Sequence, residues 1–278
     1  MIHLTDVGKR YDSGLEAVRG ISLHVGPGEF VSLLGASGCG KSTVLRLAAG
    51  LEAPSRGSVA VPHGAGGDVA FVFQEPTLMP WASVFDNVWL PLRLAGQRRA
   101  AAAARVQEAL ATVGLSTFAE AYPAQLSGGM KMRASIARAL VTRPQVLLMD
   151  EPFAALDDLT RSRLNADLLA WWAAQRLAAL FVTHNIAEAV FLSSRVLVMA
   201  PRPGRVVAEH VIDEPYPRQP SFRSSPRYVE HCRVLAEALE AAHEAVGAAQ
   251  PQVDPALPGY LNPRGGRDGP PARTWGRQ

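Results

Sequence analysis

The sequence of 278 residues has little cysteine, little net charge and no long apolar segment. Its two cysteines, Cys39 and Cys232, are too few for a disulfide framework, so a reducing compartment fits. The net charge of +3 is too small to indicate a nucleic-acid-binding surface. No apolar run reaches the ~18 residues that would span a membrane, because the longest candidate, 168–182, is interrupted by Gln175 and Arg176. These absences exclude a disulfide-rich small domain and a membrane-spanning chain.

The first residues also lack the features of a signal peptide. Asp6 and Lys9 stand where such a peptide needs an apolar stretch, so we expect a cytoplasmic protein. What the sequence does have is an ordinary apolar fraction of 48% and enough length for one large α/β domain with appendages.

The order of expected elements indicates two kinds of sheet. Residues 1–30 alternate between apolar and polar residues, which predicts short antiparallel strands. A continuous apolar run at 30–34 predicts a buried parallel strand that leads into a glycine-rich loop and a helix over 42–49. Further along, expected strands at 146–149, 179–183, 195–199 and 206–212 surround expected helices at 157–176 and 186–192. This alternation is typical of an α/β fold with a parallel sheet covered by helices.

The remaining segments read as appendages to that sheet. A helical insert begins at Ser83, a residue suited to cap a helix, includes a helix over 99–113 and ends near residue 143. A C-terminal extension, 214–246, contains a helix over 227–246. The tail at 247–278 is rich in Pro, Gly and Arg, and we expect it to be disordered.

The strongest local motif is Gly35-Ala-Ser-Gly-Cys-Gly-Lys41-Ser42, which matches a phosphate-binding loop between a strand and a helix. Its glycines let successive backbone N–H groups point at one anion, and the helix adds its positive end. Lys41 would reach the β- and γ-phosphates and Ser42 would bind Mg²⁺. Cys39 could be activated by the helix N-terminus or could simply fill the turn as a small residue. The nucleotide-binding candidates here are Gly35, Ser37, Gly38, Cys39, Gly40, Lys41, Ser42 and Thr43.

Two adjacent carboxylates, Asp150 and Glu151, follow the apolar strand at 146–149. Such a pair at the end of a buried strand is costly unless a cation is present, so Asp150 is a candidate Mg²⁺ ligand. The alternative is a solvated pair in a loop, which the four preceding apolar residues disfavour.

The phosphate loop, the stretch Leu126-Ser-Gly-Gly-Met130 and the carboxylate pair occur in an order that resembles the ATP-binding subunit of an ABC transporter. The resemblance covers about residues 4–212. It implies a P-loop NTPase with a RecA-like parallel sheet, an N-terminal antiparallel β-subdomain and an inserted α-helical subdomain at about 76–143, within an ATPase domain of residues 1–213.

The resemblance also assigns roles in ATP hydrolysis. It implies that Glu151 is the general base, that Gln74 senses Mg²⁺ and the terminal phosphate, that His184 contacts the γ-phosphate, and that Tyr11 stacks on adenine. Each has a structural alternative when considered alone. His184 could be an ordinary histidine at a strand end, Tyr11 could pack on the small sheet, and an isolated glutamine such as Gln74 says little.

The Ser127-Gly128-Gly129 turn implies a second copy of the chain. By itself, Ser127 can be a simple N-cap of the following helix. In the family, this turn binds the γ-phosphate of ATP held by the other subunit, and Asp157 lies in a dimer-contact loop while also capping a helix. The resemblance therefore implies a homodimer or a pair with a related ATPase subunit.

Two stretches, 75–88 and 200–205, resemble the importer branch for nitrate, sulfonates and taurine. The resemblance implies a subunit bound peripherally to the cytoplasmic face of the inner membrane through permease subunits, with a solute-binding protein as an indirect partner and no nucleic acid. Leu78, Met79 and Phe85 are candidates for contacting the permease. Two rivals are a soluble ABC-type ATPase acting on nucleic acid or ribosomes and a phosphoryl-transferring kinase; neither the second cassette nor the zinc-binding cysteines common in the first rival are present.

Overall fold

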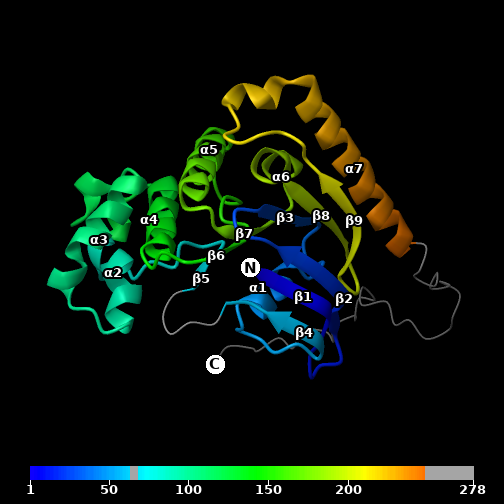
Figure 1. Ribbon diagram of the computed structural model, residues 1–278, viewed down its shortest axis with the longest axis horizontal. Coiled ribbons are helices and arrows are strands. Elements are labelled where there is room, and N and C mark those ends of the chain that lie inside the picture. The colour runs from blue at the N-terminus through cyan, green and yellow to red at the C-terminus, as the bar shows by residue number, and fades with distance from the viewer. Residues whose placement is uncertain (63–67, 248–278) are drawn as a thin grey trace, which may run out of the picture.

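The computed structural model describes residues 1–62 and 68–247, which form two sheets flanked by helices (Figure 1). Of the tail expected to be disordered, all but Gly247 lies outside the described residues. Within the described part of the chain, no helix is long and apolar enough to cross a membrane.

The larger sheet has the strand order β5-β6-β7-β3-β8-β9. Its strands are β3 (Phe30–Gly35), β5 (Val69–Val72), β6 (Val146–Asp150), β7 (Ala178–Thr183), β8 (Arg195–Ala200) and β9 (Arg205–Val211). Every pair is parallel except β8 with β9, which form a hairpin at the edge. The predicted parallel sheet is confirmed, with an antiparallel edge strand that the alternation of elements did not specify.

The central strand β3 is buried on both sides. Phe30 and Leu34 pack into the core on one face, and Val31 and Leu33 pack into the core on the other, all with no exposed surface. Successive side chains of a strand point to opposite faces, so a strand covered on both faces must be apolar throughout. This explains the uninterrupted apolar run that the sequence shows at 30–34.

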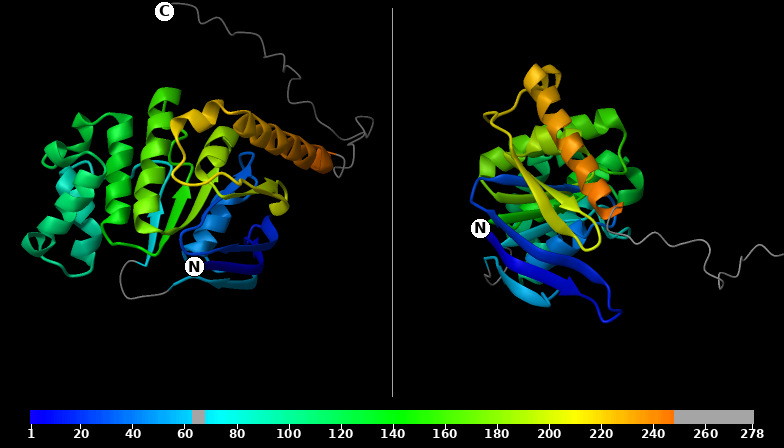
Figure 2. Two further views of the ribbon diagram at one scale, coloured as in Figure 1. Left: turned by 45° about the horizontal axis from the view of Figure 1, so that its top comes forward. Right: turned by 90° about the vertical axis from the view of Figure 1, so that its right-hand side faces the viewer.

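The two faces have different covers (Figures 1 and 2). One face is covered by α5 (Asp158–Gln175), α6 (Ile186–Leu192) and α7 (Pro226–Gly247). The other is covered by α1 (Lys41–Ala48) and the smaller sheet. The tryptophans of α5 take part in the first cover: Trp172 meets Phe30 edge-on, with 5.6 Å between ring centroids.

The smaller sheet is antiparallel, as expected, with the order β2-β1-β4. It consists of β1 (Ile2–Arg10), β2 (Glu16–Val25) and β4 (Arg56–Ala60). The strand β4 was not predicted, because it is exposed along most of its length and shows no apolar alternation. Its Gly57 has φ of +78°, and a Cβ there would lie 2.4 Å from the Thr5 carbonyl oxygen, so close pairing with β1 depends on glycine.

The helices α2 (Val84–Leu94), α3 (Arg99–Thr112) and α4 (Gly128–Leu140) lie together beyond the β5 edge of the larger sheet (Figure 1). The Ser83 hydroxyl accepts a hydrogen bond from the Asp86 N–H at 3.1 Å, which confirms the predicted N-cap of α2.

The C-terminal extension packs on α6. The Arg218 guanidinium donates to the carbonyls of Val190 and Phe191 at 2.8 and 3.0 Å, which satisfies free carbonyls in the last turn of that helix. Tyr216 and Tyr228 donate to the carbonyls of Leu192 and Ala187. The extension therefore fixes both ends of α6 against the sheet.

Candidate functional site

The carboxyl ends of four parallel strands open into one cleft of about 400 Å³. The loops after β3, β5, β6 and β8 enter it, since parallel strands end at the same edge of a sheet. Predicted site residues line the cleft together with residues that were not predicted. The lining residues are Tyr11, Leu15, Glu16, Ala17, Ser37, Gly38, Gly40, Lys41, Ser42, Thr43, Gln74, Asp150, Glu151 and Arg202.

The glycine-rich loop has the backbone shape of an anion cradle. Gly38 and Gly40 have φ of +77° and +95°, which residues with a side chain rarely adopt. A Cβ at Gly40 would also lie 2.7 Å from Val18 Cγ1 and 2.8 Å from the Ala17 carbonyl oxygen. The helix α1 begins at Lys41, so its N-terminal N–H groups and its positive dipole end face the same cradle.

Lys41 is almost fully buried, with 4% of its surface exposed. Its ammonium donates to the carbonyls of Gly35 and Ala36 at 2.7 and 2.9 Å, and lies 3.3 Å from Glu151 Oε1. These contacts hold the only strongly buried lysine of the described residues against the phosphate loop. The charge is thus placed where a bound phosphate chain would meet it.

Ser42 and Asp150 form the hard-oxygen group expected of a Mg²⁺ site. The Ser42 hydroxyl donates to Asp150 Oδ1 at 2.9 Å, across the gap between α1 and the end of β6. Burial raises the pKa of Asp150, so its charged form lacks adequate solvation within the protein itself. A carboxylate, a hydroxyl and the nearby Gln74 amide supply the oxygen ligands that Mg²⁺ prefers, and these residues fit the ion.

Glu151 lies between Lys41 and His184. Its Oε1 faces the lysine, and its Oε2 is 2.7 Å from His184 Nδ1. The backbone of Glu151 has φ of +43°, a left-handed conformation that is strained for a residue with a side chain, and its N–H donates to the Val182 carbonyl of β7 at 3.0 Å. Such strain persists only where surrounding contacts enforce it, and it often marks a functional site.

Tyr11 lines the cleft at the end formed by the small sheet. Its hydroxyl donates to Glu52 Oε2 at 2.9 Å, and the Lys9 ammonium lies 5.2 Å from the centre of its ring. Glu52 also faces Lys9 and Arg46 at 3.7 and 3.6 Å. The ring is therefore held by polar contacts at its edge and face rather than packed into the core of the small sheet.

The Ser127 turn does not belong to this cleft. Ser127 and Gly128 are exposed, and the Ser127 hydroxyl accepts from the Met130 N–H at 3.3 Å, which confirms the expected N-cap. Asp157 is also exposed and accepts from the Thr160 N–H at 2.9 Å as the N-cap of α5. A Cβ at Gly129 would lie 2.9 Å from Thr160 Cγ2, so the two caps belong to closely packed helices.

Cys39 takes the second of the two roles considered above. It has no exposed surface, and burial raises the pKa of its thiol. A Cβ at Gly35 would lie 2.7 Å from its sulfur. Cys39 is thus a small residue that fills the turn, and it lies beneath the cleft rather than on its lining.

Sequence reasoning missed Arg202 as a site residue. It belongs to the β8–β9 turn and lines the same cleft as Tyr11 and Lys41, 160 residues from the phosphate loop. The turn is anchored because the Gly204 N–H donates to the Ala17 carbonyl at 2.9 Å, and a Cβ at Gly204 would lie 2.1 Å from the Cys39 carbonyl oxygen. The Pro-Arg-Pro-Gly stretch was a visible turn signal, but nothing local shows that this turn contacts the phosphate loop.

One candidate contact was wrong. Phe85 is only 3% exposed, because it lies on the apolar face of α2, and the Arg99 guanidinium covers its ring at 4.2 Å. Leu78 and Met79 are half-buried. The exposed aromatic residue of this stretch is Trp81, with 77% of its surface accessible.

The comparisons with known proteins agree on one family. A family model described as "ABC transporter" matches residues 18–154. The taurine import ATP-binding protein TauB of Rhizobium johnstonii is 48% identical over 73% of this chain and 79% of its own. Two solved structures share the fold. The ATP-binding cassette MJ0796 bound to ADP and Pi is 31% identical with a TM-score of 0.66, and the match covers 77% of this chain and 100% of that one. CbiO1 of Clostridium perfringens, part of the transporter complex cbiONQ, is 25% identical with a TM-score of 0.70, and the match covers 88% of this chain and 98% of that one. The chain therefore belongs to the ATP-binding proteins of ABC transporters, and it is an ATPase whose cofactors are ATP and Mg²⁺.

Proposed function

We propose that this chain is the ATPase subunit of an importer for a small solute such as taurine, another sulfonate or nitrate. The likeness to taurine import proteins over most of the chain supports this branch. The rival function on nucleic acid has no comparable support, since the net charge is small.

We assign the binding of ATP to three groups of the cleft. Tyr11 stacks on the adenine. Lys41 and Thr43 bind the phosphate chain together with the backbone N–H groups of the loop formed by Gly35, Ser37, Gly38, Cys39 and Gly40. Ser42, Asp150 and Gln74 would hold Mg²⁺, which neutralises charge that develops on the phosphate oxygens during hydrolysis.

Glu151 acts as the general base on the attacking water. Its carboxylate is held between two groups, Lys41 at 3.3 Å and His184 at 2.7 Å, which fixes its direction. The same contacts bring His184 to the side of the cleft where the γ-phosphate would lie. A base held in one position needs no reorganisation when it takes a proton from the attacking water, and this contributes to its catalytic effect.

A second copy of the chain completes the site. Ser127, Gly128 and Gly129 offer an N-cap hydroxyl and backbone N–H groups at a helix N-terminus, but all three lie outside the cleft, and Ser127 and Gly128 are exposed. An anion site of this kind can serve an ATP molecule only if the ATP is brought by another chain. We therefore propose a dimer in which each Ser127 turn binds the γ-phosphate held by the partner, with Asp157 at the contact.

The dimer would bind to permease subunits and would thereby be held at the cytoplasmic face of the membrane as a peripheral protein. Trp81, with Leu78 and Met79 beside it, replaces Phe85 as the proposed contact. ATP stabilises the closed pair more than the open pair, so hydrolysis can drive the docked permease between two states. A solute-binding protein would deliver the solute to the permease and would not touch this chain.

The observation that carries the proposal is the separation of the Ser127 turn from a cleft that is lined by most of the other residues assigned to the phosphates. To test the proposal, the oligomeric state of the Glu151→Gln variant is measured by light scattering in the presence of MgATP. We expect a stable dimer. A strict monomer in the presence of its permease would contradict it. Uptake of labelled taurine, an alkyl sulfonate and nitrate is compared between cells with and without this chain, and the solute whose uptake is lost is the one transported. If the reaction yields only ADP and phosphate, with no labelled acceptor, the kinase alternative is excluded.

A further inference from the structure

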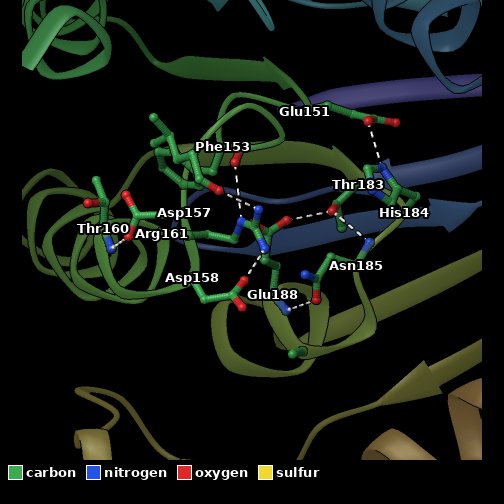
Figure 3. A network of polar contacts seen from close by, with 12 residues as sticks. Glu151, Phe153, Asp157, Asp158, Thr160, Arg161, Thr183, His184, Asn185 and Glu188 are labelled. Atoms are coloured by element: carbon green, nitrogen blue, oxygen red, sulfur yellow. Dashed lines mark hydrogen bonds and ion pairs between the residues drawn. The ribbon is translucent and has the colours of Figure 1, made fainter. Parts of the chain in front are cut away.

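A buried polar network connects the segment after Glu151 with the segment that carries His184 (Figure 3). Its centre is Glu188 of α6, which is only 4% exposed. Glu188 Oε2 accepts from the Thr183 hydroxyl at 2.5 Å, and Thr183 Oγ1 in turn accepts from the Asn185 N–H at 2.9 Å. Thr183 and Asn185 stand on either side of His184 in the sequence, so these contacts hold the segment that carries that histidine.

Arg161 of α5 binds the other segment. Its guanidinium donates to the carbonyls of Phe153 and Leu156 at 3.2 and 2.5 Å, and both lie between Glu151 and Asp157. It also donates to Asp158, whose side chain is 98% exposed. Two main-chain contacts on one rigid fork hold this loop in a single shape.

The two halves of the network meet at one ion pair. Arg161 Nε lies 3.7 Å from Glu188 Oε1, and this buried oxygen has no hydrogen-bond partner among the described residues. A buried carboxylate oxygen without a hydrogen bond is costly, so its retention calls for an explanation. The pair is thus a direct link between α5, which begins at the exposed Asp157 cap, and α6, which follows His184.

We propose that Arg161 and Glu188 are positioning residues for ATP hydrolysis. They hold Glu151 and His184 in a fixed position relative to the segment that ends at Asp157. Neither residue lines the cleft, and both are bonded to the segments that follow Glu151 and His184 rather than to the phosphate loop. The role rests on the proposed function, because Asp157 is assigned there to the contact between two copies. A change in the shape of the 153–157 segment on dimer contact would reach His184 through this pair.

The tests are Arg161→Ala and Glu188→Gln in the full-length chain, compared with Arg163→Ala. Arg163 is an exposed arginine of the same helix with no hydrogen bond or ion pair within the described ranges. Its replacement removes the same charge and leaves the pair of Arg161 and Glu188 intact. We expect Arg161→Ala and Glu188→Gln to lower kcat between about 10- and 100-fold, the cost of misplacing catalytic groups by about an ångström. The dissociation constant for ATP should stay within about twofold of the wild-type value, because the cleft lining is unchanged.

Thermal stability separates positioning from a structural role. Burial raises the pKa of Glu188, so its charged form is costly in the folded protein, and Glu188→Gln removes that charge. The glutamine variant should therefore melt no lower than the wild type while its turnover falls. The double variant should be no slower than the slower single variant, since both remove one link.

Two outcomes would overturn the proposal: kcat values within twofold of Arg163→Ala, or losses of turnover that follow losses in melting temperature and ATP affinity. Light scattering of the Glu151→Gln variant distinguishes a failure of this proposal from a failure of the proposed function. Normal turnover in Arg161→Ala with an intact ATP-dependent dimer contradicts the link alone, whereas a monomeric Glu151→Gln variant contradicts the dimer.

Discussion

The nucleotide cleft and the Ser127 turn are both proposed to bind phosphate, but they differ in how far the single chain organises them. The cleft buries Lys41, strains the backbone at Glu151 and brings together loops from four strands. The turn is an exposed N-cap with one hydrogen bond of its own. The cleft is thus organised within one chain, and the exposed turn supports the proposal that Ser127 functions together with a partner subunit. Each prediction below tests one side of this contrast.

The largest effect is expected at Glu151. Replacement by glutamine removes the general base but keeps the size of the side chain, so the turnover of ATP should fall by about 100-fold or more. ATP should still bind, because Lys41 and the phosphate loop are unchanged. The measurements are phosphate release and equilibrium binding of ATP. Near-normal turnover would remove Glu151 from the role of base.

A pair of caps tests the turn. Ser127→Ala and Ser83→Ala each remove an N-cap hydrogen bond, from α4 and α2 respectively, and each should cost about 1 kcal/mol of stability. Only Ser127→Ala should also lower the ATPase rate, by roughly tenfold, because the hydroxyl is lost from a phosphate contact. Melting temperatures and ATPase rates of both variants are the measurements. Equal rates in the two variants would reduce Ser127 to a simple cap.

Arg202 tests how far the cleft extends. The lining carries Lys41 and Arg202 against Glu16, Asp150 and Glu151, and among the described residues Arg202 forms no ion pair. Arg202→Ala should therefore weaken ATP binding by about three- to tenfold, with a larger effect at low salt. The control is Arg205→Ala, which removes the same charge from the same hairpin outside the lining. An identical loss in both variants, or none in either, would exclude Arg202 from the site.

The smallest effect concerns the C-terminal extension, far from either anion site. His210 Nε2 and His231 Nδ1 are 2.8 Å apart between β9 and α7. Burial lowers the pKa of both rings, and for His231 the neighbouring His210, Arg227 and Arg218 lower it further. Below the unfolded value of 6.5, the unfolded chain takes up more protons than the folded one, so stability falls as the pH decreases from 7 towards 5.

Replacing His210 by glutamine should reduce this pH dependence. The difference in melting temperature between pH 7 and pH 5 should shrink by about 2 °C, a small value because both rings are only partly buried. ATP binding should not change between the wild type and the variant at pH 7. An unchanged pH slope would show that the pair does not hold α7 on β9.

Much of the site was predictable because short-range rules specify it. A glycine-rich loop between a buried strand and a helix, and two carboxylates at a strand end, are recognisable from a few adjacent residues. The strand β4 was missed because exposure along an edge removes the apolar pattern on which the prediction depends. Phe85 was misjudged because a sequence pattern shows that α2 has an apolar face but not what covers that face.

The sequence by itself was enough to propose the chemistry of the cleft: a loop suited to phosphate, oxygen ligands suited to Mg²⁺ and a carboxylate that follows them. Only the tertiary structure decided that Arg202 lines the cleft, that Glu52 holds Tyr11 and that Arg161 reaches Glu188. The physical reason is range. Local backbone conformation follows from neighbouring residues, whereas strand order and contacts between side chains far apart in the chain depend on how whole helices and strands pack.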